Sequence, residues 1–227
     1  MTGQSRTTAT RALAAFAASV LVALVAVGAA QAREAYSFSS KGVSADAYWE
    51  SCTTERGLTT CTFSNIYAFQ GTERSRDTGT MRGTTVCFYT ETFTYRSGPG
   101  QGPGGESSFE SGCSSAPSGT LSVSNDLTSA TLGASTVTIW TYECTEEDCV
   151  PVTSREVTVS GWWTAGGPLF SFSERFKFDD GTCTYTFSGK GQGRDGVATG
   201  TVDGTSLGES GYASISSGMF TERYTCA

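Results

Sequence analysis

The sequence predicts an all-β fold, an antiparallel barrel or sandwich of about ten to twelve short strands stapled by disulfides. Three observations predict it. Apolar and polar residues alternate in run after run, and these runs are rich in Thr, Val, Tyr and Phe. Turn residues separate the runs so closely that no room is left for crossover helices, which favours antiparallel pairing. Eight cysteines lie among the same runs.

The first 32 residues have the composition of an export signal. Arg6 and Arg11 give a positively charged start without acidic residues, and an apolar stretch covers residues 12–27. Residues 30–32, Ala-Gln-Ala, then form a small-x-small site of the kind that signal peptidase cuts. The apolar stretch is shorter than the ~20 residues that span a bilayer. We therefore expect a secreted, extracellular protein, cleaved near Ala32 and without a membrane anchor.

We expect residues 33–227 to form a single all-β domain. Two similar β halves, 33–133 and 134–227, are the alternative, because each half holds four cysteines and a Trp shortly before a close Cys pair. The chain carries 15 Lys and Arg against 22 Asp and Glu, a net charge of −7. An acidic surface disfavours nucleic acid and anionic membranes as partners.

The clearest strand pattern covers residues 168–178. Phe170, Phe172, Phe176 and Phe178 alternate there with polar side chains, which predicts a strand with one buried aromatic face. The other strand-like runs are 60–69, 84–95, 135–142, 156–163, 182–188, 197–202 and 219–226, with weaker ones at 43–49 and 211–215. Turn residues at 179–181, 195–196 and 203–204 punctuate them.

The cysteines predict four disulfides, because an even number in an exported chain is typical of a disulfide framework. They are Cys52, Cys61, Cys87, Cys113, Cys144, Cys149, Cys183 and Cys226. Eight cysteines allow 105 connectivities. Short spacing favours Cys52–Cys61 and Cys144–Cys149, which leaves Cys87–Cys113 and Cys183–Cys226 as longer closures. A zinc site is disfavoured, since the chain has no CxxC pair and no histidine.

The absence of histidine also excludes Ser-His-Asp and Cys-His catalysis. The GxSxG match at 204–208 lacks the helix and the histidine that a nucleophile elbow needs, so it is interpreted as a turn between strands. The GxGxxG match at 191–196 is followed by a β pattern instead of a helix, which disfavours a dinucleotide site. Three consecutive acids at 146–148 do not have the alternating spacing of a calcium loop. We predict no cofactor and no metal.

Two glutamates interrupt aromatic faces and are the candidate catalytic residues. Glu91 lies among Tyr89, Phe93 and Tyr95, and Glu174 interrupts the phenylalanine face of residues 170–178. A buried carboxylate is costly unless it is paired or lines a wet cleft. Glu91 and Glu174 could therefore be the acid and nucleophile of a glycoside hydrolase, whose carboxyl groups lie about 5–10 Å apart. The alternatives are that the aromatic face is partly exposed, or that each glutamate pairs with an arginine such as Arg96, Arg175 or Arg223.

The tryptophans are candidate ligand-binding residues. Trp162 and Trp163, with Trp49, could provide an aromatic platform for sugar rings. Adjacent residues of a strand point to opposite faces, so only one of Trp162 and Trp163 can lie in the core.

A resemblance can be stated on three stretches. Residues 157–163 with Gly-Gly-Pro at 166–168, residues 126–132 (DLTSATL) and residues 194–200 (RDGVATG) resemble uncharacterised secreted β proteins of high-GC Gram-positive bacteria. The resemblance implies no activity and no functional residue.

These observations predict a binding or structural module more readily than an enzyme. A glycan or a small apolar molecule is the expected ligand. A glycoside hydrolase is one alternative. A protein-binding inhibitor or effector that acts through the Gly- and Pro-rich loop at 97–106 is another.

Overall fold

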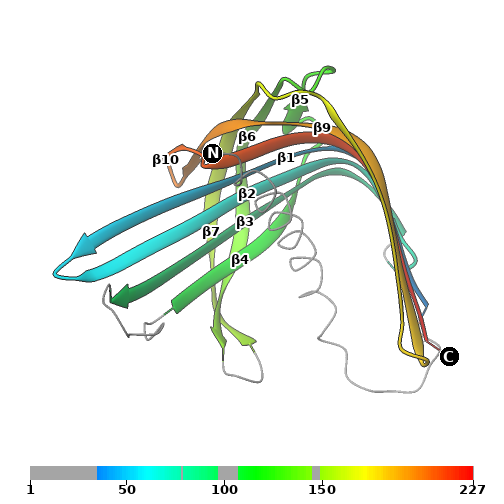
Figure 1. Ribbon diagram of the computed structural model, residues 1–227, viewed down its shortest axis with the longest axis horizontal. Coiled ribbons are helices and arrows are strands. Elements are labelled where there is room, and N and C mark those ends of the chain that lie inside the picture. The colour runs from blue at the N-terminus through cyan, green and yellow to red at the C-terminus, as the bar shows by residue number, and fades with distance from the viewer. Residues whose placement is uncertain (1–34, 78, 97–106, 145–148, 227) are drawn as a thin grey trace, which may run out of the picture. The chain divides into compact units, whose positions relative to one another are not determined.

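The computed structural model describes residues 35–77, 79–96, 107–144 and 149–226 (Figure 1). These described residues belong to one compact unit. Its strands are β1 (Ala35–Glu55), β2 (Leu58–Ser75), β3 (Gly79–Arg96), β4 (Ser107–Ala116), β5 (Leu121–Val123), β6 (Ser129–Cys144), β7 (Cys149–Ala165), β8 (Phe170–Asp179), β9 (Cys183–Val202), β10 (Thr205–Glu209) and β11 (Tyr212–Cys226). The predicted signal at 1–32 and the loop at 97–106 lie outside the described residues.

The strands form one sheet in a ring-like arrangement. The hydrogen-bonded order is β10-β9-β11-β1-β2-β3-β4-β6-β5, and β7 joins β6 to β9. Following the neighbours from β9 through β11, β1, β2, β3, β4, β6 and β7 therefore leads back to β9. All pairings within the described strands are antiparallel. The prediction of an antiparallel all-β fold with disulfides is confirmed.

The strands are longer than predicted. The runs 182–188 and 197–202 are parts of the single strand β9, which has 20 residues. The Asp195-Gly196 pair between them is not a turn, because Asp195 pairs with Ser214 and Gly196 pairs with Ala213 inside the sheet. Neighbouring strands on both sides hold this segment extended, so the sheet overrides the local turn preference.

The prediction of a buried phenylalanine face on β8 is wrong. The side chains of Phe176 and Phe178 are each 55% exposed, and that of Phe170 is 39% exposed. The reason is topological, since β8 pairs with β9 alone and branches off the ring. The alternation of apolar and polar residues therefore predicts correctly that β8 is a strand. It does not show whether another part of the protein covers the apolar face.

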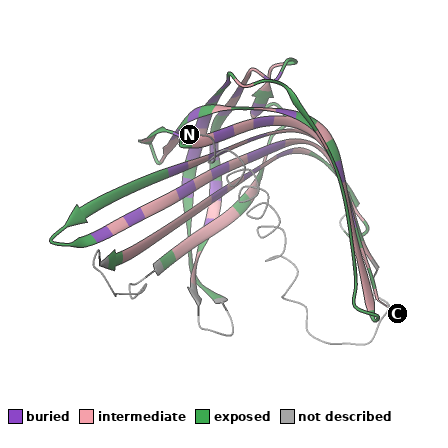
Figure 2. Ribbon diagram, in the orientation of Figure 1, coloured by how far each residue is buried: buried purple, intermediate pink, exposed green. Residues whose placement is uncertain are grey.

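The buried core lies where the middles of the long strands meet β5, β6 and β7 (Figure 2). Trp163 is completely buried, and its indole Nε1 donates to the carbonyl oxygen of Asp46 over 2.9 Å. Trp49 is 4% exposed, and its Nε1 donates to the carbonyl oxygen of Gly208 over 3.1 Å. Buried indole N–H groups need such partners, so the two tryptophans fix β7 and β10 against β1.

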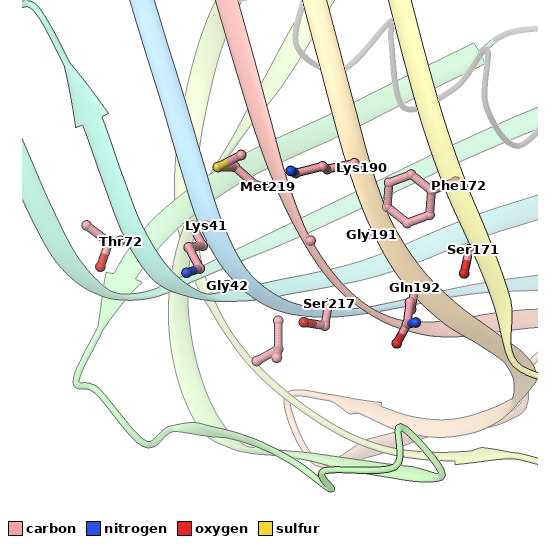
Figure 3. Close-up of a pocket in the computed structure, with 12 residues that line it drawn as sticks. Lys41, Gly42, Thr72, Ser171, Phe172, Lys190, Gly191, Gln192, Ser217 and Met219 are labelled. Carbon is pink, nitrogen blue, oxygen red and sulfur yellow. The ribbon is translucent and has the colours of Figure 1, made fainter.

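A row of glycines crosses five neighbouring strands at one register position. In sheet order these are Gly191 of β9, Gly218 of β11, Gly42 of β1, Gly71 of β2 and Gly83 of β3. The long strands bend here, as the close-up shows at Gly42 and Gly191 (Figure 3). A Cβ atom on Gly42 would collide with the carbonyl oxygen of Gln70, and one on Gly71 with that of Lys41. The bend thus depends on backbone approach that only glycine permits.

Three disulfides join residues that lie directly opposite each other on paired strands. Cys52–Cys61 joins β1 to β2, Cys87–Cys113 joins β3 to β4, and Cys183–Cys226 joins β9 to β11. Their Cα atoms are 4.0–4.1 Å apart. These three predicted pairings are confirmed. The fourth prediction concerns Cys144 and Cys149, which pair in register, but their side chains lie outside the described residues.

We expect Gly71→Ala to lower the free energy of unfolding by about 1–3 kcal/mol, the usual cost of forcing atoms into a filled site. Gly83→Ala is the matched control from the same row, because its Cβ would meet only the Ala116 carbonyl oxygen, at 3.5 Å. Urea unfolding of both variants measures the difference. Equal effects of the two changes would contradict the role of the glycine row.

Removing the Cys183–Cys226 bridge as a double Ser variant should cost about 2–5 kcal/mol of stability. Removing Cys52–Cys61 should cost roughly 1 kcal/mol less, because it closes a loop of 9 residues rather than 43 and restricts the unfolded chain less. Thermal and denaturant unfolding of the two double variants test this order, and the reverse order would refute the chain-entropy explanation.

Candidate functional site

The sheet presents two chemically different faces. The core face is defined by Ala45, Ala68 and Val86, which are buried and lie opposite one another on β1, β2 and β3. Because successive side chains of a strand point to opposite faces, the residues next to these three in sequence lie on the opposite face of the sheet. We call it the aromatic face, since Tyr67 occupies it between Asp46 and Cys87.

Six of the aromatic side chains on the aromatic face of β2, β3, β4 and β6 lie in or next to the register row of Glu91, and we call these six the aromatic platform. They are Phe63, Tyr89, Phe93, Phe109, Trp140 and Tyr142. The ring centroid of Phe109 lies 5.1 Å from that of Tyr89 and 5.0 Å from that of Tyr142. Stacked and tilted pairs at this spacing are favourable. Trp140 is 43% exposed at the β6 end of the platform.

Glu91 lies inside the aromatic platform, directly opposite Phe63 on one side and Phe109 on the other. The Tyr89 hydroxyl donates to Glu91 Oε2 over 2.5 Å. Burial raises the pKa of Tyr89 above its ordinary range, and the bond to the Glu91 carboxylate adds to this. The Tyr89 bond thus holds the Glu91 side chain in place, and its remaining oxygen lone pairs can accept a hydrogen bond from a ligand hydroxyl.

The structure does not bring Glu91 and Glu174 together. Glu174 is exposed on β8. Stepping across the sheet from Glu174, through the residue directly opposite on each next strand, arrives at Met81 on β3. Glu91 lies ten residues further along β3, about 33 Å of strand at ~3.3 Å per residue. The four strands β9, β11, β1 and β2 also separate β8 from β3. A glycosidase pair needs a separation of about 5–10 Å.

The predicted tryptophans divide between the core and the surface. Trp49 and Trp163 are core residues, whereas Trp162 is 53% exposed, so the prediction that only one of the adjacent pair is in the core is confirmed. Trp162 lies between Thr131 and Thr199 of the neighbouring strands, and its Nε1 donates to Thr164 Oγ1 over 3.1 Å. No other ring is paired with it among the described neighbours.

Sequence reasoning missed Trp140, Tyr142 and Phe109. Trp140 and Tyr142 are two residues apart, and this spacing was the signal that both lie on one face of a strand. Phe109 follows the Gly- and Pro-rich stretch and lies in a strand rich in Ser, so the local pattern is a weak signal for β4. Pairing between β4 and β6 is what places these rings together.

A half-buried carboxylate lies beside the platform on β1. Asn65 Nδ2 donates to Asp46 Oδ1 over 2.6 Å, and Tyr67 lies directly opposite Asp46 in the sheet. Burial raises the pKa of Asp46 from 3.8 to about 6, although the Asn65 bond opposes this shift. Burial also raises the pKa values of Tyr48 and Tyr67, with the Asp46 charge adding to both.

One cluster of possible metal ligands occurs in the part of the chain that the structure describes. It combines Glu50 with Cys52 and Cys61, whose sulfur atoms are joined in a disulfide and therefore are not thiolate ligands. Within the same described ranges, no helix is long and apolar enough to cross a bilayer.

Comparison with known proteins returned no matching protein-family model, curated protein or solved structure. The resemblance to secreted β proteins of high-GC Gram-positive bacteria therefore stays a prediction.

The raised pKa of Asp46 predicts a specific pH dependence of stability. Between pH 3.8 and about 6, the unfolded chain releases the Asp46 proton while the folded protein keeps it. The stability contribution of this group should therefore fall with rising pH, by up to ~3 kcal/mol, and stay constant above that window. Asp46→Asn, which can still accept the Asn65 bond, should be the more stable protein at pH 7.5 and equal to the parent at pH 3.5.

Chemical denaturation across this pH range measures the difference between parent and variant. Glu50→Gln, an exposed change of the same charge on the same face, is the control and should shift stability by less than ~0.5 kcal/mol. A parent–variant difference that does not change with pH would contradict the burial of the Asp46 carboxyl group.

Proposed function

We propose that this protein is a secreted extracellular binding module that holds a glycan on the aromatic platform. The observation that carries the proposal is the exposed Trp140 beside the contacting rings of Phe109 and Tyr142, with Glu91 oriented among them. Flat aromatic rings offer apolar area at little entropic cost, and a fixed carboxylate accepts hydrogen bonds from hydroxyl groups. Sugars present both kinds of surface, apolar C–H faces and a rim of hydroxyls.

The extracellular location is supported from two sides. Three disulfides are formed, which is typical of proteins that fold in oxidising compartments. The export signal predicted at residues 1–32 agrees with this location. A binding surface built on strands that disulfides hold together needs no cellular partner to keep its shape.

The hydrolase that would pair Glu91 with Glu174 is disfavoured, because Glu174 lies on another part of the sheet. Glycoside hydrolysis requires two carboxyl groups that flank the same bond. The flat, open form of the platform favours a chain-like glycan over a small apolar molecule, which would need an enclosed pocket. The inhibitor alternative depends on residues 97–106, which lie outside the described residues.

The platform predicts a difference between the two exposed tryptophans. In affinity electrophoresis, separate gels contain xylan, soluble β-glucan, glycol chitin or starch. At least one of these polysaccharides should slow the migration of the parent protein. Trp140→Ala and Tyr142→Ala should each weaken that interaction about thirtyfold, since an aromatic anchor that the ligand covers contributes on the order of 2 kcal/mol. Trp162→Ala is the control and should bind as the parent does.

Two results would overturn the proposal. One is a parent protein that none of the four polysaccharides retards. The other is an equal loss of retardation in the Trp140 and Trp162 variants, because stacking would then not be located on the platform. Release of reducing sugar during the same incubations would favour the hydrolase alternative instead.

A further inference from the structure

The part of the sheet beyond the glycine row carries a second surface that the aromatic platform does not include. We call this part the arm. It consists of β8 with residues 35–42 of β1, 71–75 of β2, 79–83 of β3, 183–191 of β9 and 218–226 of β11. The arm continues the core face of the sheet outward, past the buried residues, so that face becomes open to solvent there.

Positive charge concentrates on this outer continuation of the core face. Eight of the chain's 15 Lys and Arg residues gather here, and all eight are exposed. They are Lys41, Arg74, Arg76, Arg82, Arg175, Lys177, Lys190 and Arg223. We call this surface the cationic face. All three lysines of the chain belong to it.

Negative charge is directed to the other side of the same strands. Glu73, Glu174 and Glu222 lie on the aromatic face by strand alternation, opposite Ser40, Gly189 and Phe187 respectively. Asp179 is the acidic residue within the described strands of the cationic face, and its Oδ2 lies 3.3 Å from Lys177 Nζ at the end of β8. A chain of net charge −7 thus has one strongly positive surface.

Two shallow grooves run over the cationic face. The first has a volume of about 760 Å³ and lies on the glycine row, where Lys41 and Lys190 accompany Thr72, Gln192 and Ser217 (Figure 3). The second has a volume of about 340 Å³, and its lining is dominated by Arg74, Arg76 and Arg223 with the hydroxyls of Ser37, Ser39 and Thr221. Each groove therefore combines cations with uncharged hydrogen-bonding groups.

The spacing of the charges suits a polymer rather than a single ion. Lys41 and Lys190 lie in one register row with Met219 between them, so their Cα atoms are about 10 Å apart across two strand spacings. Arg74 of β2 and Arg223 of β11 lie further outward on the two strands that flank β1, opposite Ser39 and Ser37 respectively. An extended chain with repeated anionic groups would meet several of these cations at once, and each contact would release counterions.

We propose that the cationic face binds an extended anionic polysaccharide. Charge complementarity selects a polyanion, and the interleaved Ser, Thr and Gln side chains match the hydroxyl groups of sugars. Single-stranded nucleic acid is disfavoured, because its binding surfaces use aromatic rings to stack bases. Two rings, Phe38 and Phe172, are among the groove-lining residues, and both lie on the aromatic face by strand alternation. This site lies on a different face from the aromatic platform and goes beyond the proposed function.

Lysine footprinting tests the site on the full secreted chain. Acetylation of Lys41, Lys177 and Lys190 is measured by mass spectrometry with dextran sulfate and with uncharged dextran, two polymers that share one backbone. We expect dextran sulfate to reduce modification of Lys41 and Lys190 several-fold, while dextran has no effect. A lysine-containing peptide in the same mixture is the reference for amine reactivity. Equal protection by both polymers, or equal protection of the peptide and the protein lysines, would overturn the proposal.

Charge variants provide the matched comparison. Lys41→Gln/Lys190→Gln and Arg74→Gln/Arg223→Gln should each weaken dextran sulfate binding about tenfold at 0.1 M salt and flatten its dependence on salt concentration. Arg56→Gln, the same charge change in the exposed turn between β1 and β2, should leave both unchanged. An equal effect of Arg56→Gln would show attraction by net charge and refute a defined site.

Two further measurements separate this inference from others. Tighter binding of duplex DNA or of phosphatidylglycerol vesicles than of dextran sulfate, at the same salt concentration, would reassign the face and overturn the proposal. Trp140→Ala should not alter dextran sulfate binding. Loss of neutral glycan binding in that variant with retained dextran sulfate binding would show that the two sites act independently, so either proposal can fail without the other.

Discussion

The structure depends on a row of five glycines that lets five long strands bend at one level. At Gly42 and Gly71 the backbones of neighbouring strands approach so closely that a methyl group would strike a carbonyl oxygen. Phe172, at the β8 end of the row, lays its ring over the positions that side chains of Gly191 and Gly218 would occupy. An aromatic ring that covers strand glycines is a known way to stabilise them. The bend divides each strand into a part around the core and a part that extends into the arm.

Beyond that bend, the sheet lacks a second layer within the described residues, and the fold is held by other means. Cys183–Cys226 joins the outer ends of β9 and β11. Long uninterrupted registers, such as the pairing of β1 with β2 from Phe38 to Glu55, satisfy the backbone without help from a packed layer. Strand alternation then separates chemistry cleanly. Within the described strands of the arm, the rings and the glutamates occupy one face, and Lys and Arg occupy the other together with Asp179.

Both proposed binding surfaces follow from this open, two-faced geometry. A ligand that is extended and flat can lie along a sheet face and make repeated contacts, whereas a small molecule needs enclosure. The aromatic platform and the cationic face also differ in their forces. Stacking on rings is insensitive to salt, while counterion release makes binding to the cationic face fall as salt rises. One chain could therefore hold two polymers, or two features of one cell-surface polymer, at separate places.

The sequence alone determined the strand-rich class and the antiparallel pairing, and it correctly favoured three disulfide pairings. These follow from local patterns: alternation, turn chemistry and cysteine spacing. Tertiary structure decided what covers each face. The alternation of Phe170 to Phe178 is the same whether or not another layer packs on it, so burial could not be predicted. Likewise, the glycine row, the grouping of Trp140 with Phe109, and the separation of Glu91 from Glu174 exist only once the strand registers are set. Register joins residues that are distant in sequence, and no local pattern encodes it.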